Sequence, residues 1–176
     1  STLFLHTELY IEEESSLQKL STLVTNSFGF AVVSMQQFNF ELEFQNQITV
    51  VLDGIRDPGN LGTIIRICDW YGIKQIVLSP DCTDYFNPKV IAASMGSFSR
   101  IHFKYIDLEQ LFRGNSNIPV LGALLDGDDI HSIAFPTACF LLFGNESNGI
   151  RLENLPFISQ KVTIPKYGNA ESLNVG

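Results

Sequence analysis

From Ile48 onward, short continuous apolar runs alternate with stretches of helical periodicity, a pattern that few folds accommodate. Because the apolar runs are continuous rather than alternating, each strand should be buried on both faces, as in a parallel sheet covered by helices. We therefore expect an α/β domain with a mostly parallel sheet and helices on both faces. The expected strands span residues 48–55, 75–79, 101–106, 120–125, 138–143 and 161–164, and the expected helices span 61–71, 88–95, 108–112 and 152–155.

The first of these helices has a clear apolar face. Ile64, Ile65, Cys68 and Tyr71 recur at helical spacing, so we expect this face to pack on the sheet. The single Trp70 stands on the same helix, and its size and apolar character predict that it belongs to the core.

The first 40 residues follow a different pattern and are too few for a domain with a substantial core of its own. We interpret residues 1–40 as a small or truncated α+β accessory segment and residues 41–176 as the main domain. The polar and aromatic stretch 38–46 suits a linker or an edge segment between them. Within the accessory segment we expect strands at 3–5, 8–11 and 30–33 and one or two helical turns at 15–20.

Length and composition bound the class of protein. The 176 residues are 45% hydrophobic and 17% charged, which suits one domain with a proper core and a small appendage. No apolar run approaches the roughly 18 residues needed to span a bilayer, so we expect no membrane partner. Cys68, Cys82 and Cys139 lie far apart, which disfavours a disulfide framework and makes a reducing cytoplasm the expected location.

The sequence also predicts no metal site. His6, His102 and His131 are scattered along the chain and stand near no cysteine pair. The acidic run at residues 126–129 (DGDD) resembles a metal-binding loop, but no EF-hand spacing follows it. We therefore expect a polar turn there.

The net charge of −8 argues against a general polyanion binder, because phosphate contacts are made by Lys and Arg. The charge is unevenly distributed: residues 1–47 hold one basic and six acidic residues, whereas residues 48–105 hold six basic and five acidic ones. Any RNA binding should therefore be weak, salt-sensitive and dependent on a specific site. The basic residues of the middle segment are Arg56, Arg66, Lys74, Lys89, Arg100 and Lys104.

Three polar clusters each follow a predicted strand at its carboxyl end, where ligands bind in open α/β sheets. The first spans residues 53–66. A turn at 58–59 precedes Asn60, which we expect to cap the following helix, and Gly62 allows close backbone approach where helix N-termini attract anions. Arg66, six residues after Asn60, could flank the same cleft, although the residue types alone favour a capped helix with a solvated arginine.

The second and third clusters are further candidate sites. Residues 143–149 form an irregular loop with glycines and one carboxylate, Glu146, which suits a nucleoside site or a plain turn equally. Residues 164–175 place Ser172 and Asn174 two positions apart, which suits a polar site or a helix cap. No G-x-S-x-G elbow is present, so a serine hydrolase finds no support.

In this order and at these spacings, the three clusters resemble the signature motifs of the SpoU-type RNA 2′-O-ribose methyltransferases of the SPOUT superfamily. The resemblance is carried by residues 58–66, 142–150 and 164–175, and residues 87–96 also match a stretch common in the family. It covers about residues 25–175. It implies a methyl transfer from S-adenosylmethionine to a ribose 2′-hydroxyl of RNA, with ribosomal RNA slightly favoured over transfer RNA.

The resemblance further implies a C-terminal trefoil knot, a homodimer in which motif one completes the partner's site, and an L30e-like N-terminal segment that selects RNA. Three departures stand out. The N-terminal portion is shorter than the L30e-like RNA-binding domain that many relatives carry. Positions 147–148 read Ser-Asn where the family usually has Gly first, and the family continues beyond position 176 into a helix that packs in the knot and the dimer interface. Carried over position by position, the cofactor contacts would be Leu124, Gly144, Asn145, Gly149, Ile164 and Leu173, and the catalytic residues Asn60, Arg66, Glu146, Ser172 and Asn174.

The implied roles follow from the chemistry. The sulfonium donor is already activated, so the protein must orient the hydroxyl and help remove its proton. The family often assigns the base role to the position of Arg66, but a guanidinium has no acceptor, so we expect Arg66 to stabilise the developing alkoxide. Glu146 and Asn60 would orient groups by hydrogen bonding, while Ser172 and Asn174 would shape the cofactor and ribose pocket.

Three alternatives stay open. The chain could be a tRNA 2′-O-ribose methyltransferase, or a catalytically silent RNA-binding member of the same fold, although the presence of all five catalytic candidates argues against silence. A generic nucleotide-binding α/β protein finds no support in a GxGxxG motif or a P-loop.

Overall fold

The computed structural model describes residues 10–20, 29, 32, 41–168, 174 and 175. The chain divides into two compact units, Ser1–Asn39 and Phe40–Gly176. In the first unit, α1 spans Glu14–Leu20 and buries no side chain, and this helix was expected at 15–20.

Of the strands expected in the first unit, only the second can be examined in part. Tyr10 and Ile11 form no strand and are 75% and 93% exposed, so the strand expected at 8–11 does not extend over them. The strand expected at 3–5 and most of the one at 30–33 lie outside the described residues.

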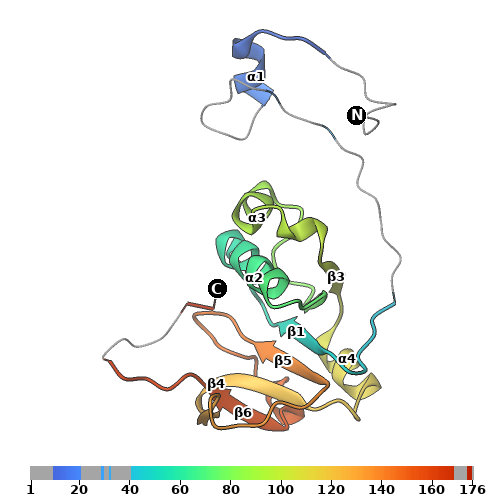
Figure 1. Cartoon of the computed structure of the whole chain (residues 1–176), viewed down its shortest axis with the longest axis vertical. Helices are drawn as coiled ribbons and strands as arrows, with labels where there is room; N and C mark the ends of the chain where they lie inside the picture. The colour runs from blue at the N-terminus through green and yellow to red at the C-terminus, as the bar shows by residue number, and fades with distance from the viewer. Residues whose placement is uncertain (1–9, 21–28, 30–31, 33–40, 169–173, 176) are drawn as a thin grey trace. The chain divides into compact units, whose positions relative to one another are not determined.

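The second unit is built on a parallel sheet of six strands (Figure 1). Their order is β3-β2-β1-β5-β4-β6, and every adjacent pair is parallel. This confirms the mostly parallel sheet, and each of the six strands expected after residue 47 is present. The strands are β1 (Ile48–Leu52), β2 (Gln75–Leu78), β3 (His102–Tyr105), β4 (Val120–Asp129), β5 (Cys139–Phe143) and β6 (Gln160–Thr163).

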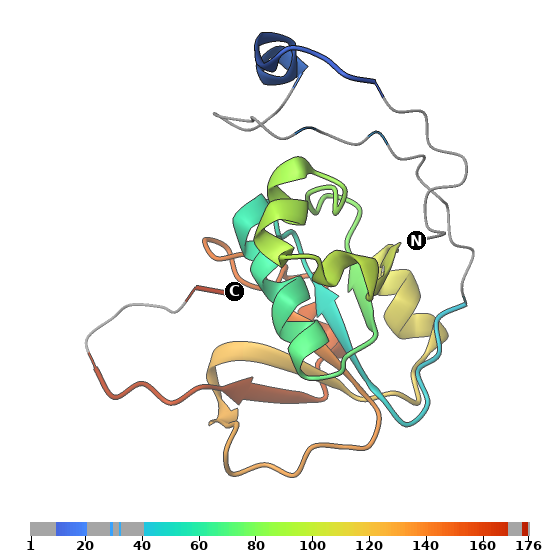
Figure 2. The ribbon, with the colours of Figure 1, turned by 45° about the horizontal axis from the view of Figure 1, so that its top comes forward.

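Helices cover both faces of this sheet, as expected. On one face, α2 (Pro58–Trp70) and α3 (Pro88–Ser94) lie side by side (Figure 2), followed by the short 3-10 helix η1 (Ser97–Ser99). On the other face, α4 (Leu108–Gly114) packs with the 3-10 helix η2 (Leu155–Phe157). Successive β1 residues alternate between the two cores: Val50 and Leu52 join the α2 side, and Val51 joins the α4 side.

Two local expectations were wrong. The helix expected at 152–155 is a turn followed by η2, because Pro156 interrupts the segment and removes a backbone donor. The acidic run at 126–129 is not a polar turn but the end of β4, which pairs with β6 through a register shift. Gly127 makes this possible, because a Cβ there would lie 2.5 Å from the backbone of Val162.

The aromatic residues at the end of α2 were also misplaced by the sequence pattern. Trp70 is 85% and Tyr71 76% exposed, so neither belongs to the core. Trp70 lies five positions after buried Ile65, about 140° around the helix, and so points away from the sheet. Tyr71 is the C-cap, where the helical periodicity that placed it on the apolar face ends.

Helices α2 and α3 approach each other closely at Gly62. A Cβ at this position would lie 2.4 Å from the Cβ of Ala93 and 2.8 Å from the carbonyl oxygen of Val90. The close approach expected at Gly62 therefore exists, but it is made to a neighbouring helix.

The last described residues bear on the expected knot. Val175 packs against the core cluster that α2 forms with β1, so the chain returns to that side of the sheet after β6. Residues 169–173 lie outside the described part of the chain, and the trefoil knot stays a prediction. No helix among the described residues is long and apolar enough to cross a membrane.

Candidate functional site

The candidate site lies at the carboxyl ends of β1 and β5. The chain leaves β1 toward β2 and β3 on one side, while β5, β4 and β6 lie on the other. The crevice outside such a switch in strand order is the usual ligand site of an open α/β sheet. Two of the three polar clusters meet there, because the loops at 53–57 and 144–150 follow these adjacent strands.

The loop 144–150 is a tight turn closed by its own backbone. The N–H groups of Asn145 and Gly149 each donate to the other's carbonyl oxygen, at 3.0 and 2.8 Å. The side-chain oxygen of Asn145 accepts a further bond from the Ser147 N–H at 2.9 Å. Only glycine fits at position 144, since a Cβ there would lie 2.1 Å from the carbonyl carbon of Gly149.

Asn60 and Glu146 meet at this end of the sheet. The side-chain amide of Asn60 donates a hydrogen bond to the Glu146 carboxylate, although 86 positions separate the two residues. The expectation that Asn60 caps α2 was wrong: Asp57 is the N-cap, and its carboxylate accepts the Asn60 N–H at 2.8 Å. The residue before a proline favours the extended conformation of an N-cap, so Pro58 selects Asp57 for this role and leaves the Asn60 side chain available.

Three residues at the base of the site were not predicted as functional. Asp53, fully buried at the end of β1, accepts hydrogen bonds from the Arg151 N–H at 2.9 Å and from Arg151 Nε at 2.5 Å. It also accepts one from the side-chain amide of Asn154 at 2.9 Å. A carboxylate directly after a continuous apolar strand is a signal for such a residue, but its partners are distant in the sequence.

A second carboxylate, that of Asp81, lies near Arg151. The hydrogen bond from Ser79, aided by the nearby guanidinium of Arg56, holds the pKa of Asp81 below its ordinary value despite partial burial. Ser79 Oγ also accepts the Gly54 N–H at 2.9 Å, so the loop after β1 is fixed to the end of β2.

The remaining predicted residues are distributed as follows. Arg66 is exposed on α2 and makes no ion pair among the described residues, and no contact joins it to Asn60. Ile164 follows β6 and is 59% exposed. Asn174 is exposed, while Ser172 and Leu173 lie outside the described residues.

Leu124 lies on β4, beside β5, and packs against the cluster that includes Ile150 at the end of the loop 144–150. It lines a separate cavity of about 570 Å³ with residues of β6 and the segment before it, and its side chain is partly buried against the α4 core.

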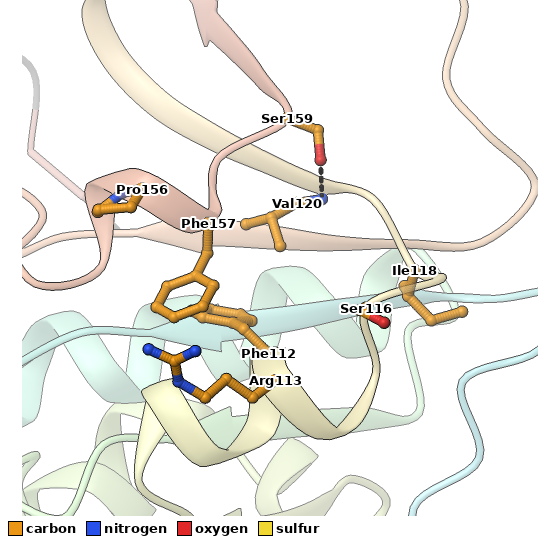
Figure 3. A pocket seen from close by; sticks show the side chains of 8 residues that line it. All are labelled: Phe112, Arg113, Ser116, Ile118, Val120, Pro156, Phe157 and Ser159. Atoms are coloured by element: carbon orange, nitrogen blue, oxygen red, sulfur yellow. Dashed lines mark hydrogen bonds between the residues drawn. The ribbon is translucent and has the colours of Figure 1, made fainter.

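Another cavity, of about 420 Å³, lies at the opposite edge of the sheet, where β4 and β6 begin (Figure 3). The Arg113 guanidinium lies 5.4 Å from the centre of the Phe157 ring, and the Val120 N–H donates to Ser159 Oγ at 3.2 Å. This cavity is lined by none of the predicted site residues. Its lining is Phe112, Arg113, Ser116, Ile118, Val120, Pro156, Phe157 and Ser159.

The site suits a nucleoside better than a metal ion. Residues 146–149 are exposed, and the space beside Gly149 is open. In the described part of the chain, no three His, Cys, Asp or Glu side chains are grouped to hold a metal.

Comparison with known proteins identifies relatives of this domain. Residues 47–176 match the model of the SpoU rRNA Methylase family. The chain is 35% identical, over 72% of its length, to the 23S rRNA (guanosine(2553)-2′-O)-methyltransferase RlmP of Bacillus subtilis, of which it covers 52%. It spans between 52% and 62% of the length of the first relatives it matches.

Solved structures show the same fold. An AdoMet-bound rRNA methyltransferase from Sinorhizobium meliloti superposes with a TM-score of 0.69 at 34% identity, over 76% of this chain and 52% of that one. The AdoMet complex of the SpoU methyltransferase AviRb from Streptomyces viridochromogenes superposes with a TM-score of 0.68 at 25% identity, over 77% and 54% of the two chains.

Proposed function

Because the chain belongs to the SpoU rRNA methylase family, we propose that it transfers a methyl group from S-adenosylmethionine to a ribose 2′-hydroxyl of RNA, with ribosomal RNA the favoured substrate. One observation carries the proposal: Asn60 of the first motif bonds to Glu146 of the second, in the crevice where the strand order switches. The names of relatives such as RlmP support the choice of ribosomal RNA.

The loop 144–150 is the proposed cofactor site. Gly144 permits the tight turn, Asn145 and Gly149 close it, and residues 146–149 are exposed to a ligand. Ile164 would contribute an apolar surface, with Leu173 and Leu124 as further contacts. When bound, S-adenosylmethionine supplies a methyl group already activated on a sulfonium.

The chain's own residues then orient the hydroxyl and manage its charge. The Asn60–Glu146 hydrogen bond fixes both side chains, which would bind and align the ribose. Arg66 would stabilise the developing alkoxide, because a guanidinium donates hydrogen bonds and accepts none. Ser172 and Asn174 would shape the ribose side of the pocket.

A homodimer would bring Arg66 to the reacting centre. Arg66 shares the exposed side of α2 with Ile67, which is 43% exposed, and with Trp70. An exposed Trp and Ile on one helix face are the residue types that protein interfaces cover. A second copy packed there would exclude water from the Ile67 and Trp70 side chains and place Arg66 near the partner's loop 144–150.

Recognition of RNA would depend on few charges. Two of the six basic residues of the segment 48–105 are held in ion pairs, Arg56 with Asp81 and Arg100 with Asp69. RNA binding should therefore be weak and salt-sensitive, with the N-terminal segment 1–40 contributing to target selection. Buried free thiols at Cys68, Cys82 and Cys139 suit a reducing cytoplasm, where we place the reaction.

Titration and a labelling assay test this function. The full-length protein is titrated calorimetrically with S-adenosylmethionine, then incubated with ribosomal or transfer RNA and a cofactor labelled in its methyl group. We expect binding and labelled ribosomal RNA. Label on transfer RNA alone would favour the tRNA enzyme, binding without transfer to either RNA would favour the silent RNA-binding member, and no cofactor binding would refute the proposal.

A further inference from the structure

The backbone of Asp53, a buried residue, is in direct contact with the strand that enters the loop 144–150. Its N–H donates to the carbonyl oxygen of Phe143 at 2.8 Å, which extends the β1–β5 pairing to the last residue before the loop. Its side chain is 0% exposed. The residue therefore stands where the loop begins, and its carboxylate is shielded from bulk solvent.

Among the described residues, three hydrogen bonds reach this carboxylate, and all of them come from the segment just after the loop. Arg151 supplies two of them, from its backbone N–H and from Nε, and Asn154, itself only 1% exposed, supplies the third. The other contacts of the Arg151 guanidinium are longer, at 3.5 Å to Asp81 and 3.6 Å to Glu153. Asp53 is thus the principal partner of Arg151.

The start of the loop is attached to the next residue along β1. The side-chain amide of Asn145 donates to the carbonyl oxygen of Gly54 at 2.9 Å, and the Gly54 N–H is itself held by Ser79 Oγ. Both ends of the loop are therefore fixed to the dipeptide Asp53-Gly54. Glu146, which bonds to Asn60, lies between these two attachments.

Packing alone does not require a carboxylate at this position. A buried ion pair contributes little more to stability than apolar side chains of the same volume. A carboxylate that accepts three bonds from one short segment does, however, define the direction in which that segment leaves the sheet.

We propose that Asp53 is a positioning residue, which acts through Arg151 and Asn154 to hold the loop 144–150 in the conformation that brings Glu146 to Asn60. This inference rests on the proposed function, because the loop so held is the proposed cofactor site. Asp53 itself touches neither reactant.

Two substitutions test the role. Asp53→Asn keeps the volume of the side chain but turns an N–H₂ group toward donors, so at least one of the three bonds is lost. Arg151→Met removes the guanidinium and leaves the two other bonds, so it perturbs the same anchor without replacing the carboxylate. Asp69→Asn is the matched control, since it breaks an arginine–carboxylate pair of 2.6 Å whose carboxylate is mostly buried, outside the loop.

The first measurement is the affinity of the full-length protein for S-adenosylmethionine. We expect about tenfold weaker binding for Arg151→Met and about 100-fold weaker binding for Asp53→Asn, with Asp69→Asn unchanged. A residue that serves stability alone would lower the melting temperature without changing the affinity of the folded protein. Wild-type affinity in a folded Asp53→Asn or Arg151→Met variant would overturn the proposal.

The second measurement needs no cofactor. The amides of Asn145 and Gly149, which bond to each other, should exchange hydrogen faster in both variants, while amides of β2 and β3 exchange as before. Unchanged exchange at the two loop amides would also overturn the proposal. If the unsubstituted protein bound no cofactor, the proposed function would fall, and the anchoring of the loop would be decided by the exchange rates alone.

Discussion

Replacement of Gly62 by alanine separates a structural role of the first motif from a ligand-binding one. The new Cβ would lie 2.4 Å from the Cβ of Ala93, 2.8 Å from the carbonyl oxygen of Val90 and 3.0 Å from the amide nitrogen of Ser94. Carbon atoms in contact stand about 3.5–4.0 Å apart, so α2 and α3 must separate by about 1 Å. Two of the three contacts are backbone atoms, which cannot rotate away.

The expected destabilisation combines two opposing effects. Overpacking of this kind costs about 1–3 kcal/mol, and alanine in place of glycine within a helix returns about 1 kcal/mol. The net loss of up to about 2 kcal/mol should lower the melting temperature by up to about 8 °C in a chain of this size. The affinity of the folded protein for S-adenosylmethionine should not change, because Gly62 contacts α3 and not the loop 144–150.

The matched control is Gly114→Ala at the last position of α4, where a Cβ would meet no atom within 4 Å. It should be neutral or stabilising by up to about 1 kcal/mol, as measured by urea unfolding. In a double-mutant cycle, Gly62→Ala should destabilise the protein less when Ala93 is replaced by glycine, because that change removes one of the three contacts. The reasoning would be refuted if Gly62→Ala were as stable as Gly114→Ala, or if it lost cofactor affinity while fully folded.

Four further changes test the site and its surroundings. Arg66→Lys should retain part of the methyl transfer activity and Arg66→Ala should lose about 10²–10³-fold in single-turnover rate; equal losses with intact cofactor binding would contradict a charge role. Glu146→Ala should lower the methyl transfer rate about 100-fold, and Glu146→Gln should lower it less, because glutamine keeps an acceptor for the side-chain amide of Asn60. A larger loss in Glu146→Gln would exclude an orienting role. The lowered pKa of Asp81 stabilises the folded protein above the unfolded-state pKa of this group, and that stability is lost as the pH falls through the folded-state pKa. Urea unfolding should therefore show that Ser79→Ala destabilises the protein less at acidic pH than at neutral pH. Trp70→Ser should weaken self-association in sedimentation, and an unchanged association constant would remove this helix face from the interface.

The location of the candidate site could be predicted from the sequence, whereas its internal connections could not. Polar clusters at strand ends predict a shared edge because parallel strands place their carboxyl ends together. Asn60 was expected as a helix cap, and its actual bond to Glu146 depends on Asp57 taking that role and on β1 lying beside β5. Leu124 and Arg66 were assigned by resemblance, and the described residues do not join them to this pair.

The α/β class, the six strands after residue 47 and the edge of the sheet at which the first two motifs meet could be predicted from the sequence alone. These properties follow from local patterns, namely continuous apolar strands and polar residues at their ends. Only the tertiary structure decided which side chains meet: Asp53 bonds to Arg151 and Asn154, which are 98 and 101 positions away. It also decided that Trp70 faces outward. Such pairings depend on the order of the strands and on which face of a helix packs against the sheet. Local sequence patterns do not specify either property, so they do not reveal which distant residues meet.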